Sequence, residues 1–137
     1  MSEIKVDTLT GKTSAGDITV TVGSTATAKL EQGLVKCWIN ANSAKTTIND
    51  SLNISSLDDD GAGDFGLNYT TSFSTVNYSW SGGLEDGGTT TAMWQVDFTN
   101  GTNATGSTDF ESYYVTASNN RTNNDNYCHL NFLGDLA

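Results

Sequence analysis

The sequence predicts a mainly β protein: short N-terminal β strands, one short neck helix and a C-terminal antiparallel β-sandwich or jelly-roll-like domain. Three observations carry this prediction. The 137 residues contain no proline and 14 glycines, and Ser, Thr and Asn are abundant, which suits strands joined by many turns. From about residue 48 onward, apolar and polar residues alternate with period 2. Residues 26–40 alone show a helical period.

The first 24 residues predict two short strands. Apolar and polar residues alternate in two runs, at Ile4 and Val6 and again at Ile18, Val20 and Val22. The residues between the runs, 10–17, are typical of a loop. Two such strands are not stable alone. We therefore expect residues 1–24 to form an attachment or trimerisation segment that packs on a sister chain or a docking site.

Residues 25–45 are expected to form a helical neck. Four residues fall at i, i+4, i+7 and i+8, which is one face of a helix: Leu30, Leu34, Cys37 and Trp38. Gly33 weakens this helix by about 1 kcal/mol relative to alanine, and so short a helix must pack to be stable. We expect Leu30, Leu34 and Trp38 to seal an oligomer interface or the base of the C-terminal domain.

Residues 46–137 predict a distal β domain of six strands. The residues that mark them are Leu52 and Ile54; Phe65, Leu67 and Tyr69; Val76, Tyr78 and Trp80; Ala92, Trp94, Val96 and Phe98; Phe110, Ser112 and Tyr114; and Cys128, Leu130 and Phe132. If successive strands run up and down, the connections 58–64, 82–88 and 119–126 share the distal end of the domain. The connections 71–75 and 99–107 then lie at the other end.

The distal connections carry the candidate partner-contact residues, because loops rather than the strands beneath them usually carry recognition. These residues are Asp58, Asp59, Asp60, Asp64, Glu85, Asp86, Arg121 and Asp125.

Charge divides the chain into two parts. The formal net charge is −10. Residues 1–45 hold five lysines and four acids, a net charge of +1, whereas the remainder holds one arginine and 12 acids, a net charge of −11. A domain with this much negative charge repels phosphate backbones. Nucleic-acid binding is therefore not expected. The first residues lack the apolar core of a secretory signal, and no window is long enough to span a membrane, so neither is expected.

Residues suited to catalysis are present, but their pattern does not build a catalytic site. Cys128 shares its strand face with Leu130 and Phe132, so it is predicted to lie in the core while His129 points outward. Cys37 is likewise expected to be a small buried hydrophobic residue. We therefore expect no catalytic residue, no cofactor and no enzyme activity.

The acidic run that begins at Asp58 has a metal-binding alternative. An EF-hand starting there would need a ligand at its fifth position, where Ala62 stands, and Glu at its twelfth, where Tyr69 stands, so this motif is excluded. A looser calcium site formed by Asp58, Asp60 and Asp64 stays an alternative to a solvated hairpin turn.

Carbohydrate chemistry is a further alternative. Acids gathered at the distal end would suit a glycosidase, but no spacing singles out an acid and a base. Trp38, Trp80 and Trp94 would suit sugar platforms. Trp80 and Trp94 belong to alternating apolar sets, however, and are predicted to be core residues.

Two blocks of sequence resemble a group of small tail-fibre-like virion structural proteins of marine bacteriophages. The first is the opening Ser2-Glu3-Ile4-Lys5-Val6-Asp7-Thr8-Leu9-Thr10-Gly11-Lys12. The second is Ser51-Leu52-Asn53-Ile54-Ser55-Ser56-Leu57-Asp58 with Gly61-Ala62-Gly63-Asp64-Phe65 after it. Beyond this block, Ser72-Phe73 and Val76-Asn77-Tyr78 resemble residues common in the same group. The resemblance covers roughly residues 2 to 80.

The resemblance implies a virion structural protein, assembled in the host cytoplasm and carried on the exterior of the tail or capsid. It implies a homotrimer whose N-terminal segment attaches to other virion proteins, and the loops of the distal domain are then our candidates for contact with a host surface receptor. A capsid-surface decoration or head-fibre protein and a bacterial carbohydrate-binding module are the alternative functions.

Overall fold

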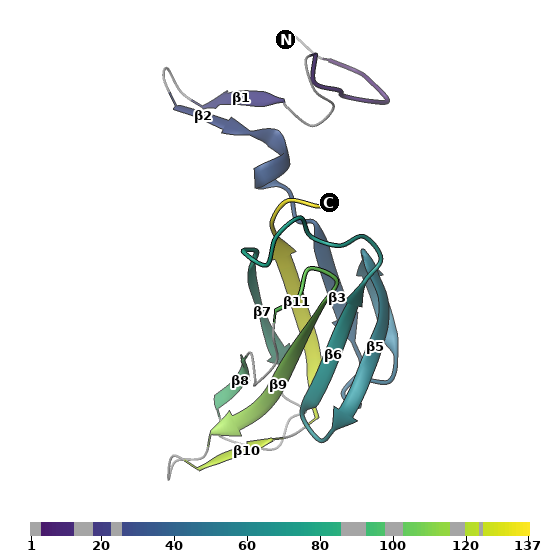
Figure 1. Cartoon of the computed structure of the whole chain (residues 1–137). Helices are drawn as coiled ribbons and strands as arrows, with labels where there is room; N and C mark the ends of the chain where they lie inside the picture. The colour runs from purple at the N-terminus through teal and green to yellow at the C-terminus, as the bar shows by residue number, and fades with distance from the viewer. Residues whose placement is uncertain are drawn as a thin grey trace. The chain divides into compact units, whose positions relative to one another are not determined.

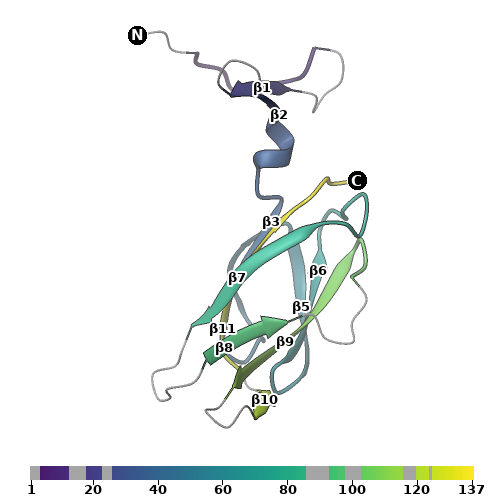
Figure 2. The same cartoon turned by 90° about the vertical axis from the view of Figure 1, so that its left-hand side faces the viewer.

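The computed structural model describes residues 4–12, 18–22, 26–85, 93–97, 103–115, 120–123 and 125–137. The chain divides into two compact units, Met1–Leu34 and Val35–Ala137. The second unit consists of two antiparallel sheets packed face to face (Figures 1 and 2). The predicted mainly β, antiparallel architecture is therefore confirmed.

The first unit contains one two-stranded sheet. β1 (Thr19–Val22) pairs antiparallel with β2 (Ala26–Lys29), and the 3-10 turn η1 (Leu30–Gly33) comes next. The strand predicted around Val20 is present, but the one predicted at Ile4 and Val6 is wrong, because residues 4–12 form no strand. A strand needs a neighbour to satisfy its N–H and C=O groups, and no described segment pairs with these residues.

The expected neck helix is also wrong. Its residues form β2, the single turn η1 and then β3 (Cys37–Ala41), in which Cys37, Ile39 and Ala41 are buried and alternate with half-buried Trp38 and Asn40. β3 is hydrogen-bonded to a strand on each side, and these two ladders outweigh the weak helical propensity of a segment that contains a glycine.

The first sheet of the second unit has the strand order β4-β3-β11-β7. Its other strands are β4 (Ile48–Leu52), β7 (Ser79–Glu85) and β11 (Tyr127–Leu133). Cys37 lies opposite Phe132, near the end of β11, and Trp38 lies opposite Leu52, the last residue of β4. β3 therefore begins where β11 and β4 end, and we call this the Cys37 end of the sandwich.

The second sheet is built around β9 (Ser107–Val115). Its other strands are β5 (Ile54–Gly61), β6 (Asp64–Tyr69), β8 (Met93–Asp97) and β10 (Arg121–Asn123). β6 and β8 both pair with Glu111 and so flank β9 on opposite sides. β8 and β10 both pair with the last three residues of β9, so β10 continues the edge occupied by β6.

The chain directions assign each connection to one end. β4 reverses into β5 at Asn53, whose φ of 61° makes a tight turn, so β5 runs away from the Cys37 end. Its hairpin partner β6 starts after Gly63, and we call this opposite end the Gly63 end. The connections 42–47 and 62–63 and residues 125–126 lie there, whereas 70–78 lies at the Cys37 end.

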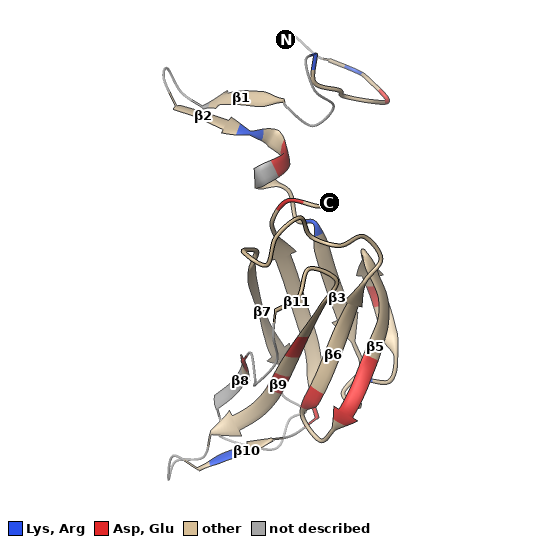
Figure 3. Cartoon of the chain, in the orientation of Figure 1, with Lys and Arg blue, Asp and Glu red and all other residues tan. Residues whose placement is uncertain are grey.

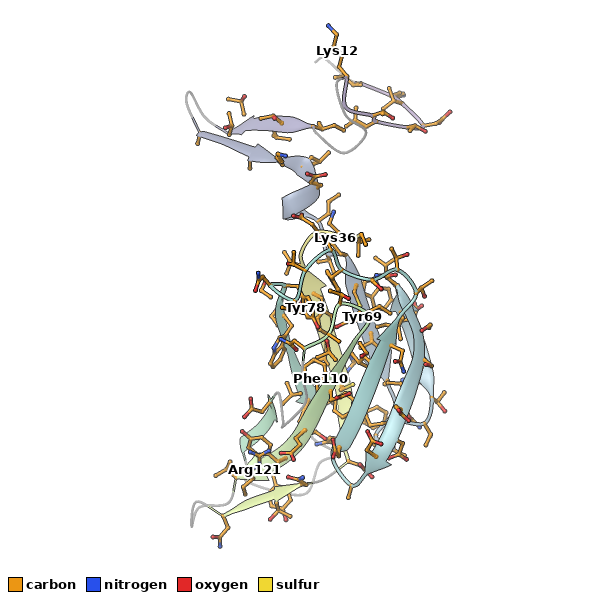
Figure 4. All side chains as sticks on the ribbon, viewed as in Figure 1. Lys12, Lys36, Tyr69, Tyr78, Phe110 and Arg121 are labelled. Carbon is orange, nitrogen blue, oxygen red and sulfur yellow. The ribbon has the colours of Figure 1, made fainter. Side chains whose placement is uncertain are left out.

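The core lies between the sheets and is rich in aromatic rings. Phe132 of β11 packs edge-on against Phe110 of β9 and Tyr69 of β6, with ring centroids 5.9 and 5.7 Å apart. Figure 4 shows the side chains of Tyr69, Tyr78 and Phe110 in this interior. The predicted burial of Cys128, Leu130 and Phe132, with His129 on the outer face, is confirmed.

A buried hydroxyl network closes the Cys37 end. The hydroxyl groups of Tyr69 and Tyr78 both meet Thr108 Oγ1, the first at 2.6 Å. The Tyr78 hydroxyl also donates to the main-chain oxygen of Ala104 at 3.1 Å. These bonds tie the connection 70–78 to the start of β9.

Several predicted strand boundaries need correction. Leu52 and Ile54 were expected to share one strand but belong to β4 and β5, on either side of the reversal at Asn53. The third predicted strand begins at Ser79 rather than Val76. β10 was not predicted. Ala92 and Phe98 of the fourth lie outside the described residues.

Candidate functional site

The structure brings most of the predicted contact residues to the Gly63 end. Asp58, Asp59 and Asp60 occupy the last part of β5, Asp64 begins β6, Glu85 ends β7, and Asp125 precedes β11. Figure 3 shows acidic residues, drawn in red, at these ends of β5 and β6 and along the middle of β9. Asp86 lies outside the described residues. The described residues of the three predicted connections thus lie at one end of the sandwich, as the strand count predicted.

An acidic face lies on the outside of the second sheet, and we define it by Asp58, Asp60, Asp64 and Asp109. Asp58 and Asp109 lie opposite Gly66 from its two sides, and a Cβ built on Gly66 would lie 3.2 Å from Asp58 Cβ and 3.1 Å from Asp109 Oδ1. A larger residue at Gly66 would separate these two acids. Glycine therefore lets them lean toward each other.

Mutual repulsion is the main electrostatic property of this face. The pKa of Asp60 is raised, first by the charge on Asp58, then by desolvation and by the charges of Asp64, Asp109 and Asp59. The Asp60 carboxylate is fully exposed, so solvent screens this repulsion strongly. A cation that approached this face would relieve it.

The arrangement of these acids is not that of a metal centre. Among the described residues, no group of three or more His, Cys, Asp or Glu side chains is arranged to hold a metal ion. Asp58 and Asp60 lie on one strand and Asp64 on the next, beyond a register shift at Asp59–Gly61. The calcium alternative for Asp58, Asp60 and Asp64 therefore gains no support from this geometry.

Arg121 already interacts with two residues of its own chain, so its charge is not free for a partner. Its guanidinium forms an ion pair with Glu111 and lies over the ring of Tyr113, 3.8 Å from the centroid. It thereby covers the outward-facing Tyr113, which is buried. We infer that Arg121 fastens β10 to β9 and partly neutralises the acidic side of this sheet.

Glu85 lies on the other sheet. It pairs across β7 and β11 with His129, with 3.5 Å between the Glu85 Oε2 and His129 Nε2 atoms, and both side chains are exposed. An exposed pair of this kind adds little stability. Glu85 therefore belongs to the Gly63 end but not to the acidic face.

Hydrogen bonds inside the Gly63 end join three segments of the chain. The Gly63 N–H donates to Asp125 Oδ1 at 2.8 Å, and the Gly63 carbonyl accepts from the Ser112 N–H at 2.6 Å. Lys45, from the connection between β3 and β4, is buried beneath them and donates from Nζ to the main-chain oxygen of Asn126. The hairpin that carries the acids is thereby fixed to the rest of the domain.

The predicted oligomer residues do not lie on one helical face. Leu30 is in η1, Leu34 comes directly after that turn and is 51% exposed, and Trp38 is a half-buried residue of β3. Leu34 is the most exposed of the three. Trp80, by contrast, packs edge-on against Phe110 with 5.3 Å between centroids, as its predicted core position requires. The side chain of Trp94 lies outside the described residues.

The two thiols are buried and free. Cys37 lies opposite Phe132, and Cys128 lies opposite Ala41, so the two are four positions apart along neighbouring strands. Burial raises the pKa of Cys37 to about 12 and that of Cys128 to about 11. Neither is a thiolate at neutral pH, so neither has the character of a nucleophile.

Sequence reasoning missed four residues, two on the outer face of β9 and two at the Gly63 end. Asp109 and Glu111 alternate with the core residue Phe110, so the period of the strand already predicted them to point outward. Lys45 and Asn126 had no such signal, because a lysine and an asparagine in connections are ordinarily exposed.

Comparison with known proteins gives no relative: no family model, no curated protein sequence and no solved structure matches the chain. Among the described residues, no helix is long and apolar enough to cross a membrane.

Proposed function

We propose that this chain is a structural protein of a bacteriophage virion, a tail fibre or similar appendage on the exterior of the particle. Its N-terminal segment attaches to other virion proteins, and its sandwich is displayed with the Gly63 end outward for contact with a host receptor. The proposal has no catalytic step. It is supported by the sequence resemblance and by the contrast between the two units of the chain.

The observation that carries the proposal is the exposure of apolar side chains in the first unit. Ile4, Val6 and Leu9 are 86%, 59% and 58% exposed. The only sheet described in this unit has two strands, which is marginal in water. Exposed apolar residues beside so small a sheet favour a segment that is completed by partner chains. Its lysines, Lys5 and Lys12 among them, distinguish it further from the acidic sandwich.

The second unit, in contrast, has a core of its own. Residues from both sheets meet in one cluster, so this unit needs no partner to fold. A stable domain joined to a segment that needs partners is the arrangement expected of a displayed knob. A homotrimer would complete the first unit with copies of itself, and Leu34 would lie in that interface.

The character of the Gly63 end indicates the kind of receptor. Acids dominate its described residues, and Arg121 is already paired with Glu111. We infer a cationic partner, or one joined through a bridging cation. A direct cationic contact weakens as salt rises, because the attraction is screened.

An adsorption experiment tests the proposal. Purified wild-type protein should occupy receptors and slow adsorption of the phage to its host. Asp59→Asn with Asp60→Asn should compete less well while melting as the wild type does. Asp135→Asn removes an exposed acid at the Cys37 end and is the matched control, which should compete fully. If the double variant competes normally and the control does not, the outward end is reversed. If wild-type protein never slows adsorption, receptor contact is refuted.

Assembly is tested separately by native mass measurement. The expected result is a mass of three chains, and Leu34→Ala should shift it toward one chain. A concentration-independent monomer would contradict the trimer. Counting copies per particle separates the alternatives, since a capsid decoration protein occurs in many copies and a fibre in few. A carbohydrate-binding module would instead bind glycans as a free monomer.

A further inference from the structure

Lys45 is a buried cation that forms no ion pair with any described carboxylate, although the charges of Asp125 and Asp59 act on it from a greater distance. Its side chain is 1% exposed, and Nζ donates to the main-chain oxygens of Ser43, at 3.0 Å, and of Asn126, while lying 5.1 Å from the centroid of the Phe65 ring. Within the described chain no acid forms an ion pair with it. Lysine is almost never fully buried unless it is paired, because desolvating its charge is costly. The residue also has a φ of 55°, which side-chain-bearing residues seldom adopt.

Asn126 carries a second buried defect beside it. Its side chain is 4% exposed, and its Nδ2 atom has no hydrogen-bond acceptor in the described part of the chain. A buried donor without an acceptor loses its hydration and gains nothing in return. A buried cation with no ion pair and a buried amide nitrogen without an acceptor therefore belong to two residues that are in direct contact.

We propose that Lys45 and Asn126 join their side chains in an intramolecular amide bond. The uncharged Nζ attacks Cγ of Asn126 and forms a C–N bond. The bond from Cγ to Nδ2 then breaks, and Nδ2 leaves as ammonia. The products are one secondary amide and one ammonia molecule, so the reaction needs no oxidant and no further reactant. The proton that the lysine ammonium gives up leaves with the ammonia as an ammonium ion, so the buried cation becomes a neutral amide and the unpartnered nitrogen departs.

The surroundings favour this reaction over hydrolysis. The hydrogen bond from Nζ to the main-chain oxygen of Asn126 brings the amine to the residue that carries the carboxamide. Burial lowers the pKa of Lys45 from its ordinary 10.5, against the opposing influence of Cys128, Asp125 and Asp59, and so raises the fraction of reactive neutral amine. Lys45 and Asn126 are both buried, so little water reaches the two reacting groups to compete.

Asp125 is the group we assign to carry the proton. It is an exposed residue that directly precedes Asn126, its charge acts on Lys45, and its Oδ1 atom accepts from the Gly63 N–H at 2.8 Å. A carboxylate there can take a proton from Nζ and deliver it to the departing nitrogen. Asp125→Asn keeps an acceptor for Gly63 but cannot transfer the proton, so it should slow the reaction without loosening the hairpin.

The bond would brace the whole domain. It joins positions 81 residues apart and links the connection after the first strand of the sandwich to the residue just before its last strand. This inference does not depend on the proposed function. An appendage exposed outside a cell would nevertheless gain resistance to unfolding from such a link.

Mass spectrometry of the full chain decides the proposal. The denatured wild-type protein should be lighter than its sequence by one ammonia, whether or not Met1 is retained, and digestion should release one branched peptide containing Lys45 and Asn126. Lys45→Met should show the full sequence mass. Lys36→Met, which changes another lysine of the same unit, should keep the loss.

Other outcomes overturn the proposal. A wild-type mass equal to the sequence mass does so without any variant. An ammonia loss that persists in Lys45→Met would also overturn the proposal, because the ammonia would then come from another residue. A succinimide at Asn100, which precedes a glycine, is one such source. Complete cross-linking in Asp125→Asn would show that Asp125 does not transfer the proton.

Discussion

Replacing Leu67 with alanine should destabilise the sandwich by about 2–5 kcal/mol, the range for truncating a well-buried leucine. Leu67 lies at the middle of the second sheet, is 0% exposed and belongs to the cluster in which both sheets meet. A domain of roughly 100 residues has a free energy of unfolding of about 5–15 kcal/mol. The change therefore removes a large part of the stability.

Thermal unfolding measures this loss. At about 4–8 °C for each kcal/mol in a domain of this size, a cost of about 3 kcal/mol corresponds to roughly 12–24 °C in Tm. Leu52→Ala is the matched control, because it makes the same chemical change on the edge strand β4, where Leu52 is 46% exposed. Its effect should stay below about 1 kcal/mol.

The comparison would refute the reasoning if both variants lost the same stability. A small effect of Leu67→Ala would mean that β6 does not face the first sheet. A large effect of Leu52→Ala would mean that a partner chain covers the edge of β4.

Three further perturbations test other parts of the account. Tyr69→Phe removes a buried hydroxyl that hydrogen-bonds Thr108 Oγ1 at 2.6 Å. It should lower the free energy of unfolding, measured in urea, by about 1–3 kcal/mol. An unchanged free energy of unfolding would show that the hydroxyl network at the Cys37 end does not stabilise the domain. Raising the pH above 9.0 should lower Tm, because thiols in the unfolded chain lose their protons there. In the folded chain the pKa values of Cys37 and Cys128 are about 12 and about 11, so both stay protonated. Cys37→Ala should flatten this decline in Tm, and an equally steep decline would contradict the assignment to the thiols. Asp60→Asn should leave Tm unchanged or raise it slightly at low salt, since it relieves repulsion on the acidic face; a clear fall in Tm would show that Asp60 has a stabilising partner.

The alternation of apolar residues predicted the sandwich well wherever a strand buries one face. Phe65, Leu67 and Tyr69, for example, are all buried. This works because the side chains of a strand alternate between its two faces, so the burial pattern is written directly into the order of residues. The same parity places Asp109 outward beside Phe110.

The prediction of a neck helix failed because a helical period and a strand period both fit the same residues. Leu30, Leu34, Cys37 and Trp38 match a helical face, but Cys37 also begins an alternating run with Ile39. Propensity over a few residues is weak, and pairing with two neighbouring strands decided the outcome. Partners that are distant in sequence are not visible in a local pattern.

Turns and buried polar residues were the other limits. Asn53 reverses the chain at a positive φ, yet its neighbours look like one continuous alternating strand. β10 is a three-residue strand, Arg-Thr-Asn, with no apolar residue to mark it. Lys45 is buried only because Ser43, Phe65 and Asn126 converge on it, and that convergence exists only in the folded chain.

The most direct test of the proposed function is a density map of the intact particle of a phage that encodes this chain. The account predicts that the sandwich occupies density on the exterior of the tail or capsid, with residues before Leu34 against other virion proteins or sister chains. The Gly63 end, with Asp59 and Asp60, should face outward. A particle that lacks this density, or one in which the acidic face is packed against the shell, would contradict the account.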